Sequence, residues 1–200
     1  MKLIRKVNSL EVKRCFSMTH FMRKFGIARK SDLIPPTRKK YLTVLKKSKH
    51  AVENLNESQL NKIVGEYKKR LRAYNAVQWY IGEVGIKETG VWKGAGGLPI
   101  SWTRGSLFDT ARKVKKALQK DSEEIQRRSK RAIPAIIKLK SIMKKEKYLF
   151  PIVFENGLGT NIRKGLPKKK VNIDDGSMRA IAFAVSGDKK IKAYIGMAKK

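Results

Sequence analysis

The stretch SMRAIAFAVSGDKKIKAYIG, Ser177–Gly196, decides how the last quarter of this 200-residue chain is expected to fold. Its first half alternates bulky with small side chains, and its second half alternates apolar residues such as Ile191 and Ile195 with lysines or small residues. Alternation with a period of two is typical of β-strands, and the intervening Ser186–Lys189 is rich in turn formers. The pattern predicts a C-terminal β-hairpin. Two strands are marginal alone, so this hairpin would need a neighbouring element or a protein partner to cover it.

The residues just before the hairpin predict a small β-rich region over 148–200. Leu149–Phe154 is an apolar run that predicts a buried strand, and a basic loop follows at 163–170. PKKK within that loop could be a nuclear address, a phosphate contact or a solvated turn. Asp174 and Asp175 precede Gly176, an order that favours an Asx-type turn over a metal site.

Helical periodicity dominates residues 37–147. Thr37 can cap a helix that reaches Leu55, and Asn56 with Gln59 forms a capping-box pattern ahead of an apolar stripe that extends to Ile81. These two helices are expected to pack antiparallel as a helical hairpin. Five glycines and two tryptophans make 87–105 a loop.

Two basic helices are predicted after this loop. Ser106 and Asp109 supply the cap of the first, and Asp121 begins a second that reaches about Lys147, with Pro134 expected to kink or divide it. The fold class is therefore α+β and mainly helical, with a basic N-terminal arm over 1–36, a helical hairpin, two further basic helices and a C-terminal β-hairpin. The arm also resembles a mitochondrial presequence in composition, because Glu11 is the only acid among its first 18 residues.

Charge points most directly to a partner. The chain holds 48 Lys and Arg against 16 Asp and Glu, a formal net charge of +32. A protein so charged attracts polyanions, and nucleic acid is the most common polyanion in cells. The function expected from the sequence is non-catalytic binding to the phosphate backbone of DNA or RNA, in packaging, replication or a ribonucleoprotein. The alternatives are a structural subunit of a ribosome or virion, and a small nuclease or nucleotide-accepting protein.

The candidate contacts are basic side chains on the two later helices and the 163–170 loop, with two tryptophans of the glycine-rich loop as platforms for unpaired bases. If the two helices pack side by side, eight of these charges form one surface. The predicted nucleic-acid-binding residues are Arg112, Lys113, Lys115, Lys116, Arg127, Arg128, Lys130, Arg131, Arg163, Lys164, Lys168, Lys169, Lys170, Trp92 and Trp102.

Catalysis has little support in the sequence. His20 and His50 are the only histidines and Cys15 is the only cysteine, so we assign no catalytic residue, no metal site and no cofactor. The single cysteine favours a reducing, intracellular setting, with nucleus, mitochondrion and virion all open. The longest apolar runs are far shorter than the roughly 20 residues of a membrane span.

Overall fold

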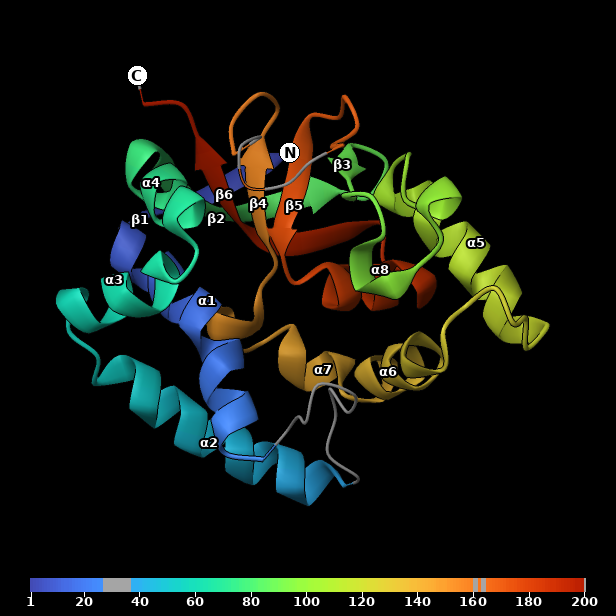
Figure 1. Ribbon diagram of the computed structural model, residues 1–200, viewed down its shortest axis with the longest axis horizontal. Helices are drawn as coiled ribbons and strands as arrows, with labels where there is room; N and C mark the ends of the chain where they lie inside the picture. The colour runs from blue at the N-terminus through green and yellow to red at the C-terminus, as the bar shows by residue number, and fades with distance from the viewer. Residues whose placement is uncertain (27–36, 160–161, 163–164, 200) are drawn as a thin grey trace.

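The protein is an α+β structure in which helices predominate, as the sequence predicted (Figure 1). The computed structural model describes residues 1–26, 37–159, 162 and 165–199. The strands in this part of the chain are β1 (Lys2–Val7), β2 (Gln78–Gly85), β3 (Thr89–Gly90), β4 (Ile152–Glu155), β5 (Val171–Asp175) and β6 (Lys190–Met197). The α-helices are α1 (Ser9–Lys24), α2 (Arg38–Glu53), α3 (Glu57–Gly65), α4 (Lys68–Ala76), α5 (Leu107–Gln119), α6 (Arg127–Lys138), α7 (Lys140–Met143) and α8 (Ser177–Val185).

All six strands form one mixed sheet in the order β1-β2-β6-β4-β5-β3. The last strand, β6, lies inside the sheet, antiparallel to β2 and parallel to β4. β4 confirms the buried strand predicted from Leu149–Phe154 only from Ile152 onward, because Leu149 ends a short 3-10 helix, Lys147–Leu149. The edges are β1, which pairs antiparallel with β2, and the short β3, which pairs parallel with β5.

The predicted C-terminal hairpin is wrong. Its first half is the helix α8, and only its second half is a strand, β6. Five consecutive residues of α8, from Ala180 to Ala184, are buried, so the helix has no polar face that would reveal a period of 3.6 in the sequence. Because β6 has strands on both sides, the predicted protein contact through a hairpin loses its structural basis.

The predicted basic arm is also corrected over its first 24 residues. Residues 2–7 form β1, and Asn8 then caps α1 by accepting a hydrogen bond from the backbone N–H of Glu11 at 2.9 Å. Val12, Cys15 and Met18 of α1 are fully buried at helical spacing. Residues 27–36 of the predicted arm lie outside the described residues.

The predicted helical hairpin is wrong in its partners. Thr37 caps α2 and the Asn56–Gln59 capping box begins α3, both as expected. However, α2 and α3 each pack on α1. The apolar stripe that predicted one helix through Ile81 is divided among α3, α4 and β2. Gly82 allows β1 to approach β2 closely, because a Cβ at this position would lie 2.5 Å from the carbonyl oxygen of Lys2 on β1.

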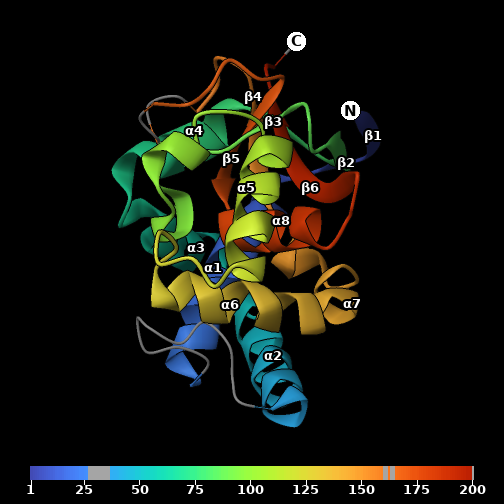
Figure 2. The same ribbon diagram turned by 90° about the vertical axis from the view of Figure 1, so that its right-hand side faces the viewer.

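Two basic helices follow the loop as predicted, α5 and α6, but the bounds predicted for the second are wrong, because Asp121 does not cap it and Lys140–Met143 form the separate helix α7. The Ser106–Asp109 capping box begins α5, whereas α6 begins only at Arg127 and continues through Pro134 to Lys138. Both helices pack on α8, and in Figure 2 α5 stands upright while α6 lies across below it. The helices are thus organised around two centres, α1 and α8.

Candidate functional site

The start of α8 is formed by a sharp turn after β5. Gly176 adopts a left-handed conformation with φ of +79°, which an L side chain rarely adopts. A Cβ on Gly176 would also lie 3.0 Å from the Cα of Pro151, so the turn has little room for another residue. Glycine has no side chain to cap the helix. The first backbone N–H groups of α8 therefore carry partial positive charge without a side-chain acceptor.

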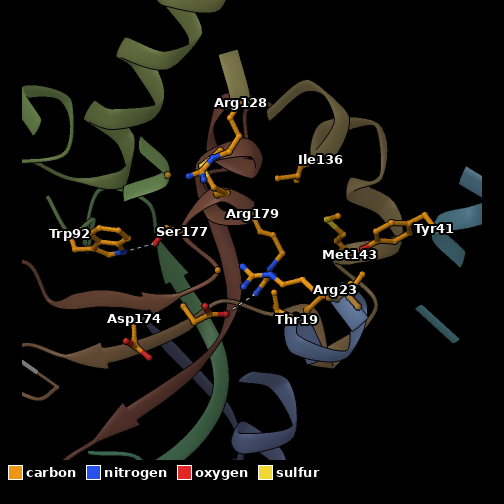
Figure 3. A pocket seen from close by; sticks show the side chains of 16 residues that line it. Thr19, Arg23, Tyr41, Trp92, Arg128, Ile136, Met143, Asp174, Ser177 and Arg179 are labelled. Atoms are coloured by element: carbon orange, nitrogen blue, oxygen red, sulfur yellow. Dashed lines mark hydrogen bonds and ion pairs between the residues drawn. The ribbon is translucent and has the colours of Figure 1, made fainter. Parts of the chain in front are cut away.

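A cavity of about 270 Å³ lies in front of this turn, between the α1 and α8 groups of helices (Figure 3). Its wall combines α1, α2, the glycine-rich loop, α6 and the β5–α8 turn. The lining residues are Thr19, Met22, Arg23, Tyr41, Trp92, Gly96, Arg128, Ile136, Met143, Leu149, Asp174, Asp175, Gly176, Ser177, Met178 and Arg179.

The two aspartates at the cavity already have basic partners. Asp174 is buried and accepts hydrogen bonds from Arg70 at 2.8 and 2.9 Å and from the Tyr74 hydroxyl at 2.8 Å. Burial and the neighbouring Asp174 raise the pKa of Tyr74, so its hydroxyl stays a donor. Asp175 accepts from Arg179 at 3.3 Å.

Two further arginines give the cavity its excess positive charge. Arg23 and Arg128 line the wall, and neither makes an ion pair within the part of the chain that the structure describes. Arg179 is mostly buried, and its Nε has no hydrogen-bond partner among the described residues. Figure 3 shows Arg179 between these two arginines. The cavity thus suits an anion.

Tyr41 adds a neutral donor at the same place. Its side chain is 1% exposed, and its hydroxyl has no hydrogen-bond partner among the described residues. Burial raises the pKa of this phenol above its usual range, so the hydroxyl keeps its proton. Figure 3 shows the hydroxyl directed from α2 towards Met143 and the cavity. A buried donor without an acceptor costs about 1–3 kcal/mol, a cost that a bound acceptor would remove.

Trp92 is fixed at the opposite side of the cavity. Its indole N–H donates to the Ser177 hydroxyl at 3.0 Å, which joins the glycine-rich loop to the first turn of α8. Ser129 of α6 holds the same loop by donating to the carbonyl oxygen of Gly96 at 2.6 Å. The predicted aromatic residue Trp92 is therefore part of the cavity wall, half-buried rather than free at the surface.

The structure does not form the predicted eight-charge surface from α5 and α6. The two helices meet α8 instead of each other, so their charges lie on two surfaces. Arg112, Lys115 and Lys116 are exposed on α5, and Lys113 is exposed while donating to the carbonyl oxygen of Ser101. On α6, Arg127, Arg128 and Arg131 are exposed and Lys130 pairs with Asp121 at 2.7 Å, so Arg128 alone of these eight lines the cavity.

The other predicted residues fall in separate places. Arg163 and Lys164 lie outside the described residues. Lys168 is exposed, Lys169 is half-buried and Lys170 pairs with Glu88 at 3.6 Å. Trp102 lies beside Lys113 and Lys116 in a shallow groove along α5, where a predicted tryptophan and two predicted lysines come together.

Sequence analysis missed Arg23, Tyr41 and Arg179. They come from three different helices, α1, α2 and α8, and Arg179 falls in the segment that was interpreted as a strand. The one available signal was the Asp-Asp-Gly turn, which precedes a helix start rather than a strand.

No group of three or more potential metal ligands occurs within the described residues, and no helix there is long and apolar enough to cross a membrane. Comparisons with protein families, curated proteins and solved structures found no match for this chain.

Proposed function

We propose that the protein binds DNA or RNA through phosphate groups, without catalysis, as a packaging, replication-associated or ribonucleoprotein component. The observation that carries this proposal is the net charge of +32. Its clearest expression is the pair of helices α5 and α6, whose outward faces carry arginines and lysines with few neighbouring acids. Such surfaces attract phosphates by releasing counterions, largely without regard to base sequence.

The cavity at the start of α8 supports the same proposal by different physics. Its arginines, the uncapped turn of the helix and the Tyr41 hydroxyl converge on one small volume. Donors that converge in this way suit the several oxygens of a single phosphate group. We therefore assign the outer helices to general attraction and the cavity to the placement of one phosphate.

The nuclease alternative draws less support from the geometry. Magnesium in nucleases is held by carboxylates that remain free to bind it, together with phosphate oxygens. Here Asp174 is occupied by Arg70 and Tyr74, and Asp175 by Arg179. Both carboxylates are therefore engaged in contacts within the cavity wall. A subunit role in a ribosome or virion would use the same phosphate contacts, so it is a setting for the proposed binding rather than a different chemistry.

The proposal can be tested on α6. Replacing Arg127, Arg128, Lys130 and Arg131 by glutamine should weaken nucleic-acid binding by similar factors for all base sequences. It should also flatten the plot of log affinity against log salt by up to about 0.9 for each phosphate that the variant no longer neutralises. Binding titrations over a salt series measure both.

The matched control removes the same number of charges from α2, where Lys39, Lys40, Lys46 and Lys47 are exposed. Both variants have the same net charge. A greater loss of nucleic-acid affinity in the α6 variant than in the α2 variant therefore identifies contacts made by α6 itself. Equal salt slopes in the wild type and the α6 variant would remove α6 from the proposed interface.

A further inference from the structure

A second cavity adjoins the first on the far side of Arg23. It measures about 460 Å³, and Thr19, Arg23 and Asp175 line both cavities. Its remaining wall comes from α1 and from the junction of α3 with α4. The lining residues outside the shared three are Phe16, His20, Ile63, Glu66, Tyr67, Lys68, Lys69, Arg70 and Ile162.

Tyr67 is the most exposed large aromatic side chain in the described part of the chain, at 55%. Two side chains of the protein contact its ring. The Arg70 guanidinium lies 4.9 Å from the ring centre, and Phe16 meets the ring edge to face at 5.9 Å. Arg70 is itself fixed by its buried ion pair with Asp174. A ring that is supported in this way and still half exposed presents an open surface for stacking.

The charges around Tyr67 also call for an anion. Lys68, Lys69 and Arg70 occupy the first turn of α4, where the helix dipole disfavours cations, and this turn contains no acid. Neither lysine makes an ion pair within the described residues. The acids that line this cavity are Glu66 and Asp175, and Asp175 pairs with Arg179.

We propose that the two adjoining cavities form one groove for single-stranded nucleic acid. One phosphate lies near Arg23, Arg128 and the Tyr41 hydroxyl, and a neighbouring unpaired base stacks on Tyr67. This inference rests on the proposed function and deepens it, because it names the form of nucleic acid. In a duplex both faces of each base are already stacked, so a duplex offers Tyr67 nothing to stack on.

The test compares Tyr67→Ala with Tyr67→Phe in the full-length chain. The probes are fluorescent oligothymidylate and oligouridylate of about 12 nucleotides, within the range of known single-strand sites, a duplex of the same length and an abasic strand. Tyr67→Ala should lower affinity for the two single strands about 5- to 150-fold, since base stacking contributes roughly 1–3 kcal/mol. Tyr67→Phe keeps the ring and should bind as the wild type does. The preference between the two single strands identifies DNA or RNA.

Phe108→Ala is the matched control. Phe108 is an exposed aromatic residue with a cation over its ring, Lys87 at 5.4 Å, but it lies at the start of α5, away from the groove. Its removal should leave single-strand affinity unchanged. Thermal unfolding of all three variants shows whether they remain folded at the temperature of the titrations, and we expect that they do, because both rings lie partly in solvent.

If Tyr67→Ala binds single strands as tightly as the wild type does, the proposed groove is wrong. An equal loss on the duplex and the abasic strand would also overturn it, because neither can stack a base on Tyr67. Absence of salt-dependent binding by the wild type to every probe would instead defeat the proposed function, and the inference with it.

Discussion

The cavity at the start of α8 and the outer faces of α5 and α6 are both positively charged, but they are built differently. On the outer faces the basic side chains reach into solvent and few have fixed partners. Around the cavity, Asp174 and Asp175 are held by ion pairs with Arg70 and Arg179, and Arg23 and Arg128 stand beside these fixed pairs without an ion pair of their own among the described residues. Net charge therefore predicts attraction to phosphate, whereas only the fold determines where a phosphate would be held in one position.

The largest expected difference between these regions is in stability. Asp174→Ala leaves Arg70 buried without its partner and should lower the free energy of unfolding by about 3–5 kcal/mol. Asp121→Ala removes the partner of Lys130 at the surface, where Asp121 is 90% exposed, and should change stability by less than about 1 kcal/mol.

Urea unfolding monitored by tryptophan fluorescence measures both variants. If Asp174→Ala yields too little folded protein, Asp174→Asn can replace it, because its amide oxygen still accepts from Tyr74 while the charge is lost. Equal changes in the free energy of unfolding for Asp174→Ala and Asp121→Ala would show that the buried ion pair stabilises the fold no more than the surface pair does.

A smaller effect of opposite sign is expected at Tyr41. Tyr41→Phe removes a buried donor that has no acceptor among the described residues, so it should raise the free energy of unfolding by about 1 kcal/mol. The same change should weaken nucleic-acid binding, because the hydroxyl is then missing from the cavity. A less stable Tyr41→Phe protein would mean that the hydroxyl already has an acceptor in the free protein.

The smallest effect concerns the outer region and pH. The hydrogen bond from Ser106, more than any other interaction, lowers the pKa of Asp109 in the capping box of α5. A carboxyl whose pKa is lower in the folded state stabilises the fold above its unfolded pKa of about 3.9, and this contribution is lost as the pH falls through the folded value.

Asp109→Asn should therefore lose less stability than the wild type between about pH 5 and pH 2, by under about 1 kcal/mol. The capping box of α3 uses Asn56 and Gln59, which do not titrate, so Gln59→Ala should leave the pH dependence unchanged. Unfolding curves at a series of pH values compare the three proteins. Parallel curves for Asp109→Asn and the wild type would contradict the assignment.

The same two regions differ in how far the sequence could predict them. Helix α5 has a capping box and a polar face, so its local signals and its final environment agree. Helix α8 is buried almost all round, and its alternation of large and small residues resembles a strand. The predicted stripe that ends in β2 failed for a related reason, because Val77 and Ile81 continue a helical spacing although the backbone of Ile81 pairs with β1 and β6.

The cavity was beyond sequence reasoning because its parts come together only through the fold. Arg23, Tyr41, Trp92, Arg128 and Arg179 belong to five different segments. Of these, Trp92 and Arg128 were named from the sequence, since a tryptophan in a glycine-rich loop and an arginine in a basic run carry local signals. Nothing local distinguishes Tyr41 from the other apolar residues of α2.

The measurement that tests the central claim most directly is the affinity of purified, nuclease-treated protein for matched single-stranded DNA, duplex DNA and RNA over a salt series. Magnesium should be present and the probes checked for cleavage afterwards. We predict that log affinity falls steeply and linearly with log salt, at a slope of roughly −0.7 to −0.9 for each phosphate neutralised, and that every probe stays intact. Weak binding that is insensitive to salt would contradict the account.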